Sequence, residues 1–149
     1  MNKERWPLES TYNTRDLGGY GNLDGKETGD HFLRSDYFQT ISPADVDYLK
    51  ERGLGLVIDL RDDHEAERLP SVFAEDGDVK YLRISLIPPE DVRQLGAGVG
   101  DDADFLFMMA DAYIYALDKS QAELAEVFRA MLAHPEKKAF FHCSAGKDR

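Results

Sequence analysis

The fold is decided by the stretch Leu54-Gly55-Leu56-Val57-Ile58-Asp59-Leu60, which is nearly continuous in apolar residues. Such a run is typical of a central strand that is covered on both faces, as in parallel sheets. Polar residues follow it at once, in Arg61-Asp62-Asp63-His64-Glu65. We therefore expect polar groups to gather at the C-terminal end of a buried strand, where α/β sheets place their binding sites.

Strand and helix patterns alternate on both sides of this stretch. Further strands are expected at His31–Arg34, Val79–Ile84 and Lys138–His142, and helices between Ser42 and Gly53, over Asp104–Lys119 and from Ser120 to Leu132. Ser42 is a candidate N-cap, and Ser120-Gln121-Ala122-Glu123 has the pattern of a capping box. The order predicts one α/β domain over residues 1–149, with a mostly parallel central sheet flanked by helices.

Composition and charge exclude several classes of partner. The 149 residues include 18 Lys and Arg against 29 Asp and Glu, a formal net charge of −11 that repels nucleic acid and anionic membranes. Apolar runs stay well short of membrane-spanning length, and the first residues lack the apolar core of a signal peptide. We expect a cytoplasmic protein without a membrane span, with secretion by an upstream segment left open.

The last eight residues, His142-Cys143-Ser144-Ala145-Gly146-Lys147-Asp148-Arg149, carry the expected chemistry. Five residues separate Cys143 from Arg149, and a segment of this length can curl into a cup whose backbone N–H groups bind an anion. Arg149 can close the cup with a planar fork that grips two oxygens of a phosphoryl group. Gly146 tolerates the backbone angles that such curling requires.

Cys143 is the single cysteine, so an internal disulfide is excluded. Inward N–H dipoles and the charge of Arg149 favour the thiolate, which can attack phosphorus and form a cysteinyl-phosphate that water resolves. His142 is expected to order the loop through hydrogen bonds, because alternation along the strand directs its side chain to the opposite face. This chemistry needs neither a metal ion nor another cofactor. The alternative is an accidental meeting of a buried Cys and a surface Arg.

The loop resembles the signature of the cysteine-based protein tyrosine and dual-specificity phosphatases. The matching residues are His142, Cys143, Gly146 and Arg149. The ending Lys147-Asp148-Arg149 is similar to the bacterial tyrosine/lipid, or triple-specificity, branch. Further segments agree in the family's order: Asn13–Gly19, Leu33–Ser35, and Asp59–Arg61 with Glu65. The resemblance therefore covers nearly the whole chain and implies a protein-tyrosine-phosphatase-like fold.

The resemblance also implies roles for single residues. Asp148 would be the general acid that protonates the leaving oxygen, with Asp91 and Glu90 as alternatives from a separate loop. Lys147 would be a cation on the substrate side, suited to a second phosphate on a phosphoinositide.

Other residues would line or support the site. Ser144, Ala145 and Gly146 would bind the substrate phosphate together with Lys147. Arg15 and Arg61 would line or brace the site, and structural salt bridging is the alternative for both. Asp16 and Asp59, like His142, would have supporting roles.

The implied function is hydrolysis of phosphomonoesters, with phosphotyrosine in proteins as the main substrate. A phosphoinositide phosphatase and a catalytically silent phospho-binding module are the alternatives. Expected partners are a phosphorylated protein or phospholipid, and phosphate or another oxyanion in the loop. Sulfur transfer and arsenate reduction are disfavoured, because the loop ending differs from sulfur-transfer loops and arsenate reduction uses additional cysteines.

The family pattern continues after the loop Arg with Thr or Ser, then Gly, and a buried helix, whereas this sequence ends at Arg149. We therefore expect a truncated domain that lacks its C-terminal helices and is feeble until a complementary C-terminal segment binds. Without that cover, apolar surface from Leu56, Ile58, Phe140 or Phe141 is expected to be exposed.

Overall fold

The computed structural model describes residues 5–27, 29–37, 41–86 and 102–149, with side chains in the last range from residue 108 onward. Within these residues a five-stranded sheet has the order β1-β2-β5-β3-β4. The strands are β1 Arg15–Asp16, β2 Phe32–Ser35, β3 Leu54–Asp59, β4 Lys80–Arg83 and β5 Lys138–His142. β1 is antiparallel to β2, and all other neighbouring pairs are parallel. The prediction of an α/β domain with a mostly parallel sheet is confirmed.

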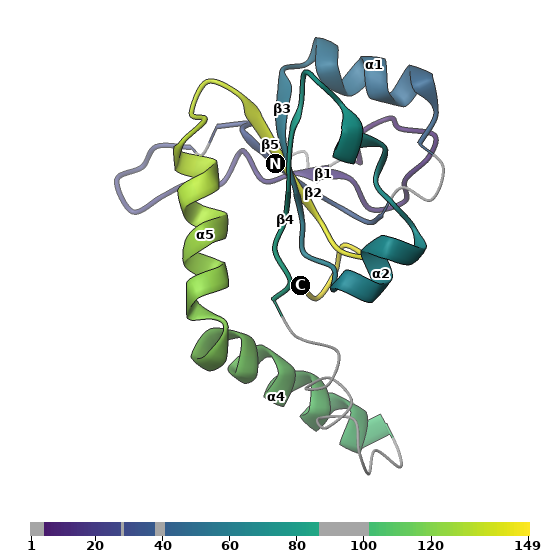
Figure 1. The fold of residues 1–149 in the computed structure, drawn as a ribbon. Coiled ribbons are helices and arrows are strands. Elements are labelled where there is room, and N and C mark those ends of the chain that lie inside the picture. Colours follow the sequence, from purple (N-terminus) through teal and green to yellow (C-terminus); the bar gives the residue numbers. More distant parts are fainter. Residues whose placement is uncertain (1–4, 28, 38–40, 87–101) are drawn as a thin grey trace.

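Helices cover both faces of this sheet (Figure 1). They are α1 Pro43–Glu51, α2 Asp63–Arg68, α4 Asp102–Lys119 and α5 Gln121–Leu132, with a 3-10 helix, η1, at Val72–Glu75. On the α1 face, Leu49 packs in one buried cluster with Val57 and Phe140. On the α5 face, Val127 packs in a second cluster with Ile58. Because β3 contributes to both clusters, the prediction that it is covered on both faces is confirmed.

The expected exposure of core strand residues is wrong for Leu56, Ile58 and Phe140. Leu56, Ile58 and Phe140 are fully buried, and Phe141 is half-buried. The reason is that α5 and α1 already cover the two faces of the strands that carry these side chains.

Of the two serines predicted to cap helices, only Ser42 does so through its side chain. Ser42 is the N-cap of α1, and its hydroxyl accepts a hydrogen bond from Asp45 N at 3.1 Å, as predicted. Ser120 makes no side-chain cap, so the predicted capping box at α5 is wrong. Its buried hydroxyl donates instead to the carbonyl oxygen of Leu86, and its backbone, at φ −104° and ψ 34°, is not in the extended conformation that is typical of an N-cap.

The parallel register brings three strand ends to one edge of the sheet. Ser35 of β2 and Asp59 of β3 both lie opposite His142 of β5. The residues that follow these strands therefore leave the sheet side by side, with α2 next to them and α4 projecting away from the sheet (Figure 1).

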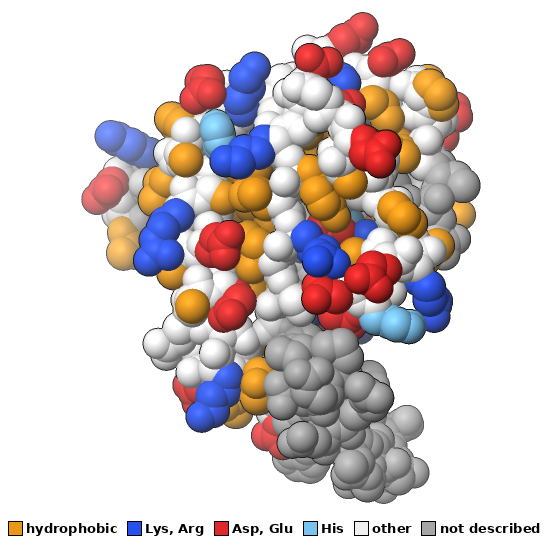
Figure 2. Space-filling view, in the orientation of Figure 1, with side chains coloured by type: hydrophobic (Ala, Val, Ile, Leu, Met, Phe, Trp, Pro, Cys, Tyr) orange, Lys and Arg blue, Asp and Glu red, His pale blue; other side chains and the backbone are white. Residues whose placement is uncertain are grey.

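The described surface carries charges of both signs. Lys and Arg side chains lie between Asp and Glu side chains across the face in Figure 2. Among the described helices, none is both long and apolar enough to cross a membrane.

Candidate active site

Cys143 follows β5 directly and lies at the start of a tight loop. Its side chain is buried, and the backbone N–H of Gly146 points at Cys143 Sγ with an N···S distance of 3.2 Å. Gly146 has φ +63°, a conformation that L side chains rarely adopt. The loop therefore curls back on the sulfur, and an inward N–H of this kind favours a negative charge there.

Arg149 closes the loop and is held end-on by Glu65. Nη1 and Nη2 of Arg149 donate to the two carboxylate oxygens of Glu65 at 2.6 and 2.8 Å. A guanidinium has five N–H donors in a fixed plane, so this end-on pair leaves Nε–H and a neighbouring N–H along the side edge. The side edge is a second fork, and it suits two oxygens of a phosphoryl group.

Glu65 is itself fixed by its own helix and by the loop. Asp62 and Glu65 form a capping box at the start of α2, with N···O distances of 2.8 and 3.1 Å. Ser144 Oγ donates to Glu65 Oε1 at 2.6 Å, so one carboxylate contacts both ends of the loop. The hydrogen bonds from Arg149, opposed by burial and helped by Ser144, lower the pKa of Glu65 from 4.5 to about 2.

A buried ionic cluster lies under the loop, between β3 and β5. Arg61 Nε and Nη2 bind the Asp59 carboxylate at 2.6 to 3.1 Å, and Nη1 donates to the carbonyl oxygen of Leu69 at 3.0 Å. Burial is the largest single influence on Asp59 and would raise its pKa, but the hydrogen bonds from Arg61 and Tyr81 and the nearby charges together outweigh it, and the pKa lies below its ordinary value. Asp59 and Arg61 thus hold each other, and this placement favours the bracing alternative for Arg61.

His142 adjoins this cluster. Nδ1 contacts the carbonyl oxygen of Cys143 at 3.1 Å, and Nε2 lies 3.8 Å from Asp59 Oδ2. Burial lowers the pKa of His142, which favours the neutral ring. Since a carbonyl only accepts, Nδ1 donates in this contact and helps to fix the peptide after Cys143.

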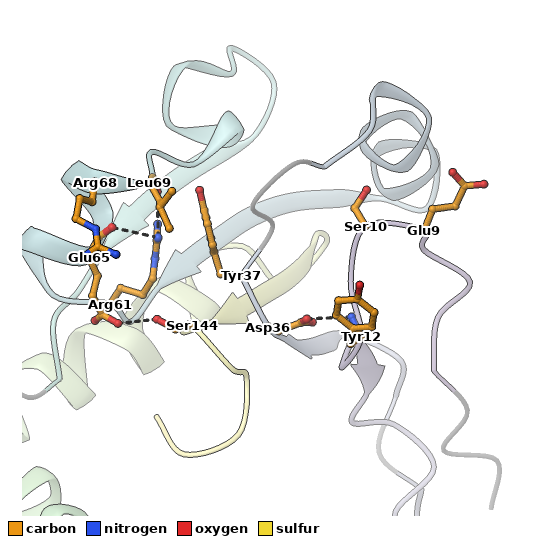
Figure 3. Close-up of a pocket in the computed structure, with 10 residues that line it drawn as sticks. All are labelled: Glu9, Ser10, Tyr12, Asp36, Tyr37, Arg61, Glu65, Arg68, Leu69 and Ser144. Atoms are coloured by element: carbon orange, nitrogen blue, oxygen red, sulfur yellow. Dashed lines mark hydrogen bonds between the residues drawn. The ribbon is translucent and has the colours of Figure 1, made fainter.

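A depression of about 570 Å³ opens beside the loop, between α2 and the N-terminal segment. Figure 3 shows Ser144 directed toward Glu65 on one side and Asp36 next to Tyr12 on the other. The Tyr37 ring stands in the depression, with the Arg61 guanidinium carbon 3.9 Å from its centroid.

The N-terminal segment contacts the loop through Asn13. Its Nδ2 donates to the carbonyl oxygens of Ala145 and Gly146 at 3.0 and 2.9 Å. Arg15 donates to the backbone oxygen of Asn13 at 3.2 Å and to its side-chain oxygen. Asp16 accepts from Gly18 N at 2.6 Å and so stabilises a turn. The structure therefore brings Arg15 to the loop through Asn13, whereas the described contact of Asp16 is local.

The end of the loop contacts α4. Tyr113 Oη donates to Asp148 Oδ1 at 2.9 Å, and Lys147 Nζ lies 3.8 Å from the same oxygen. This hydrogen bond, more than burial, raises the pKa of Tyr113. The Lys147 side chain is 72% exposed and extends into solvent. Glu90 and Asp91, the alternative acids, lie outside the described residues.

Several contacts of the site were not predicted from the sequence. Glu65, Asn13 and Arg34 were quoted only as parts of matching segments, and helix α2 was not expected. The Asp62-x-x-Glu65 pattern is the signal that predicts this helix, since it matches a capping box. Among the described residues, His, Cys, Asp and Glu form no group of three or more that could hold a metal ion.

Comparisons with known proteins agree with this geometry. A family model described as the tyrosine phosphatase family matches residues 6–149. A curated relative from Nostoc commune, described as a tyrosine-protein phosphatase, is 34% identical over 122 residues. The match covers 80% of this chain and 40% of that relative.

Proposed function

Because the chain belongs to the tyrosine phosphatase family, we propose that it hydrolyses phosphomonoesters, with phosphotyrosine in proteins as the main substrate and a cysteinyl-phosphate as the intermediate. The observation that carries the proposal is the loop itself. It has Cys143 at its start, an N–H turned to the sulfur, and Arg149 at its end, with a side edge that the Glu65 carboxylate does not occupy.

The first step transfers the phosphoryl group to the enzyme. Arg149 and the loop N–H groups bind the phosphoryl oxygens, and Cys143 Sγ attacks phosphorus from the side opposite the ester oxygen. The S–P bond forms, the P–O ester bond breaks, and protonated Asp148 gives its proton to the leaving oxygen.

The second step returns the free enzyme. Asp148, now a carboxylate, takes a proton from a water molecule, and that water attacks phosphorus. The S–P bond breaks, and inorganic phosphate leaves with the sulfur again a thiolate. Asp148 adjoins Arg149 in the loop, and its hydrogen bond from Tyr113 gives the carboxyl a defined direction.

The surroundings of the loop support an aryl phosphate as substrate. Tyr12, which is 81% exposed, and Tyr37 line the depression beside Ser144, and aromatic faces suit a planar aryl group. The exposed cation of Lys147 favours a phosphoinositide as the second candidate, because it can pair with a further phosphate. A catalytically silent binding module is disfavoured, since Cys143, Asp148 and Arg149 are all present.

A substrate panel tests the proposal. Aryl phosphate, tyrosine phosphopeptides and phosphoinositides are compared at equal concentration, and phosphopeptides are expected to give the highest kcat/KM. Cys143→Ser should abolish turnover, and Asp148→Asn should lower kcat by about 10²- to 10⁴-fold and remove one limb of the pH profile.

Retained turnover in Cys143→Ser would contradict the nucleophile assignment. An unchanged rate and pH profile in Asp148→Asn would move the general acid elsewhere, with Asp91 the next to test. Binding of phosphopeptides without any release of phosphate would favour the silent module.

A further inference from the structure

Three consecutive carbonyl oxygens of the loop, those of Ser144, Ala145 and Gly146, are bound from outside the loop. The donors are Tyr37 N at 3.0 Å to Ser144, Asn13 Nδ2 at 3.0 and 2.9 Å to Ala145 and Gly146, and Arg34 Nη2 at 2.8 Å to Gly146. All of these donors belong to β2, to the residue pair after it, or to the segment before β1.

The direction of these carbonyls sets the direction of the next N–H groups. A trans peptide is planar, so its N–H points opposite to its C=O. The N–H groups of Ala145, Gly146 and Lys147 therefore point away from the donors outside the loop. For Gly146 the result is visible, since its N–H reaches Cys143 Sγ at 3.2 Å.

The amide of Asn13 is held in the orientation that this contact needs. Arg15 donates to the side-chain oxygen of Asn13, which leaves the NH₂ group facing the loop. The backbone N–H groups of Tyr12 and Asn13 both donate to the carboxylate of Asp36 at 2.9 Å. Asn13 is thus fixed on both sides before it contacts the loop.

The loop also lies directly against the end of β2. A Cβ on Gly146 would lie 2.2 Å from the backbone of Ser35 and 2.3 Å from Asp36 N. This close approach brings the Gly146 carbonyl within reach of Asn13 and Arg34 together, so two side chains of different charge bind one oxygen.

We propose that Asn13 and Arg34 are positioning residues that turn the N–H groups of the loop toward the bound phosphoryl group. The proposal deepens the proposed function and rests on it in one respect, that the anion in the loop is a phosphoryl group. Asn13 and Arg34 act through the loop backbone.

Asn13→Leu is the main test, because Leu has a similar size and no donor. Inorganic phosphate binding is measured by calorimetry, and kcat and KM are measured with aryl phosphate. Phosphate affinity should fall about tenfold, the effect of one or two lost hydrogen bonds. The value of kcat should fall by a larger factor than KM rises, because the N–H groups stabilise charge that spreads in the transition state.

Asn22→Leu is the matched control. Asn22 also bonds backbone groups through its side chain, those of Asp24 and Lys26, but in an exposed turn away from the loop. It should leave phosphate affinity, kcat and KM unchanged. A folded Asn13→Leu variant with the phosphate affinity of the wild type would overturn the proposal, as would a wild-type protein that binds no phosphate.

Arg34→Lys decides the matter if Asn13→Leu does not fold. It keeps the positive charge, so a purely electrostatic role predicts unchanged affinity, whereas loss of the planar donor to Gly146 should weaken phosphate binding about three- to fivefold. Unchanged affinity would overturn the proposal. If both variants weaken phosphate binding while the wild type releases no phosphate from esters, the positioning role stands and the proposed hydrolysis fails.

Discussion

The arginine–carboxylate pairs Asp59–Arg61 and Glu65–Arg149 lie near the C-terminal edge of the sheet, and they differ in burial and geometry. In the pair Asp59–Arg61 both side chains are almost fully buried, at 0% and 1% exposed, and the side edge of the guanidinium faces the carboxylate. In the pair Glu65–Arg149 the side chains are 30% and 22% exposed, and the carboxylate takes the guanidinium end-on.

This difference is the one expected between a pair that only supports the fold and a pair whose arginine binds phosphate, as the proposed function requires of Arg149. The side edge of the Arg61 guanidinium binds Asp59, and Nη1 donates to the carbonyl oxygen of Leu69. The Tyr37 ring packs against one face of the same guanidinium. In Arg149 the Glu65 carboxylate leaves the side edge of the guanidinium unoccupied. An arginine–carboxylate pair can therefore support the fold or leave the arginine able to bind an anion. The edge of the guanidinium that the carboxylate occupies determines which of the two is possible.

The largest expected effect is on the buried pair. Asp59→Asn keeps the shape but leaves the Arg61 charge buried and uncompensated, so the free energy of unfolding should fall by about 3–5 kcal/mol. Urea denaturation measures it. Asp63→Asn is the matched control, because Asp63 pairs with Arg83 at the surface at 2.9 Å and should lose less than about 1 kcal/mol. Equal losses in both variants would remove the distinction between buried and exposed pairs.

The second effect is on activity. Arg149→Lys loses the planar fork, so kcat/KM should fall by about 10²- to 10³-fold, while the unfolding free energy changes by less than about 1 kcal/mol. For Arg61→Lys we expect the opposite result. The loss of unfolding free energy should exceed the effect on kcat/KM of the folded protein. Steady-state kinetics and denaturation on both variants give the comparison. Equal changes of kcat/KM and of the unfolding free energy in the two variants would mean that the two arginines share one role.

The smallest effect is the pH dependence of the half-exposed pair. The folded-state pKa of Glu65 is about 2 against an ordinary value of 4.5, so its stabilisation is present above pH 4.5 and is lost as the pH falls toward 2. The difference in unfolding free energy between wild type and Glu65→Gln should be about 1 kcal/mol at pH 6 and should shrink at pH 3. A difference that stays constant between these pH values would contradict the assigned ion pair.

Much of the fold was predictable because its signals are local. The apolar run at Leu54–Leu60 predicted a strand covered on both faces, and Ser42 predicted the start of α1. The local cap at Ser120 failed, because its backbone is not in the extended N-cap conformation and its hydroxyl is turned to a carbonyl 34 residues away. The exposure expected for Leu56 and Phe140 failed for a similar reason, since it depended on which helices cover the sheet.

The residues of the proposed chemistry were named from the sequence, whereas most of the residues that contact them were not. Cys143 and Arg149 lie close in sequence, and their spacing predicts an anion-binding loop when it is taken together with His142, Gly146 and the matching upstream segments. Their partners lie far away, with Glu65 84 residues from Arg149 and Asn13 133 residues from Gly146. Spacing within a short motif cannot identify such partners, because they meet only when parallel strands bring their ends together.

By itself, then, the sequence determined strands β2 to β5, helices α1, α4 and α5, and the short motif from Cys143 to Arg149, because periodicity, caps and short spacings act over a few neighbouring residues. Tertiary structure decided the rest. It placed the side edge of Arg61 on Asp59 and the end of the Arg149 guanidinium on Glu65, and it turned the loop carbonyls toward Asn13 and Arg34. The direction of a side chain or a peptide plane depends on which distant groups are packed against it, and that packing exists only in the folded chain.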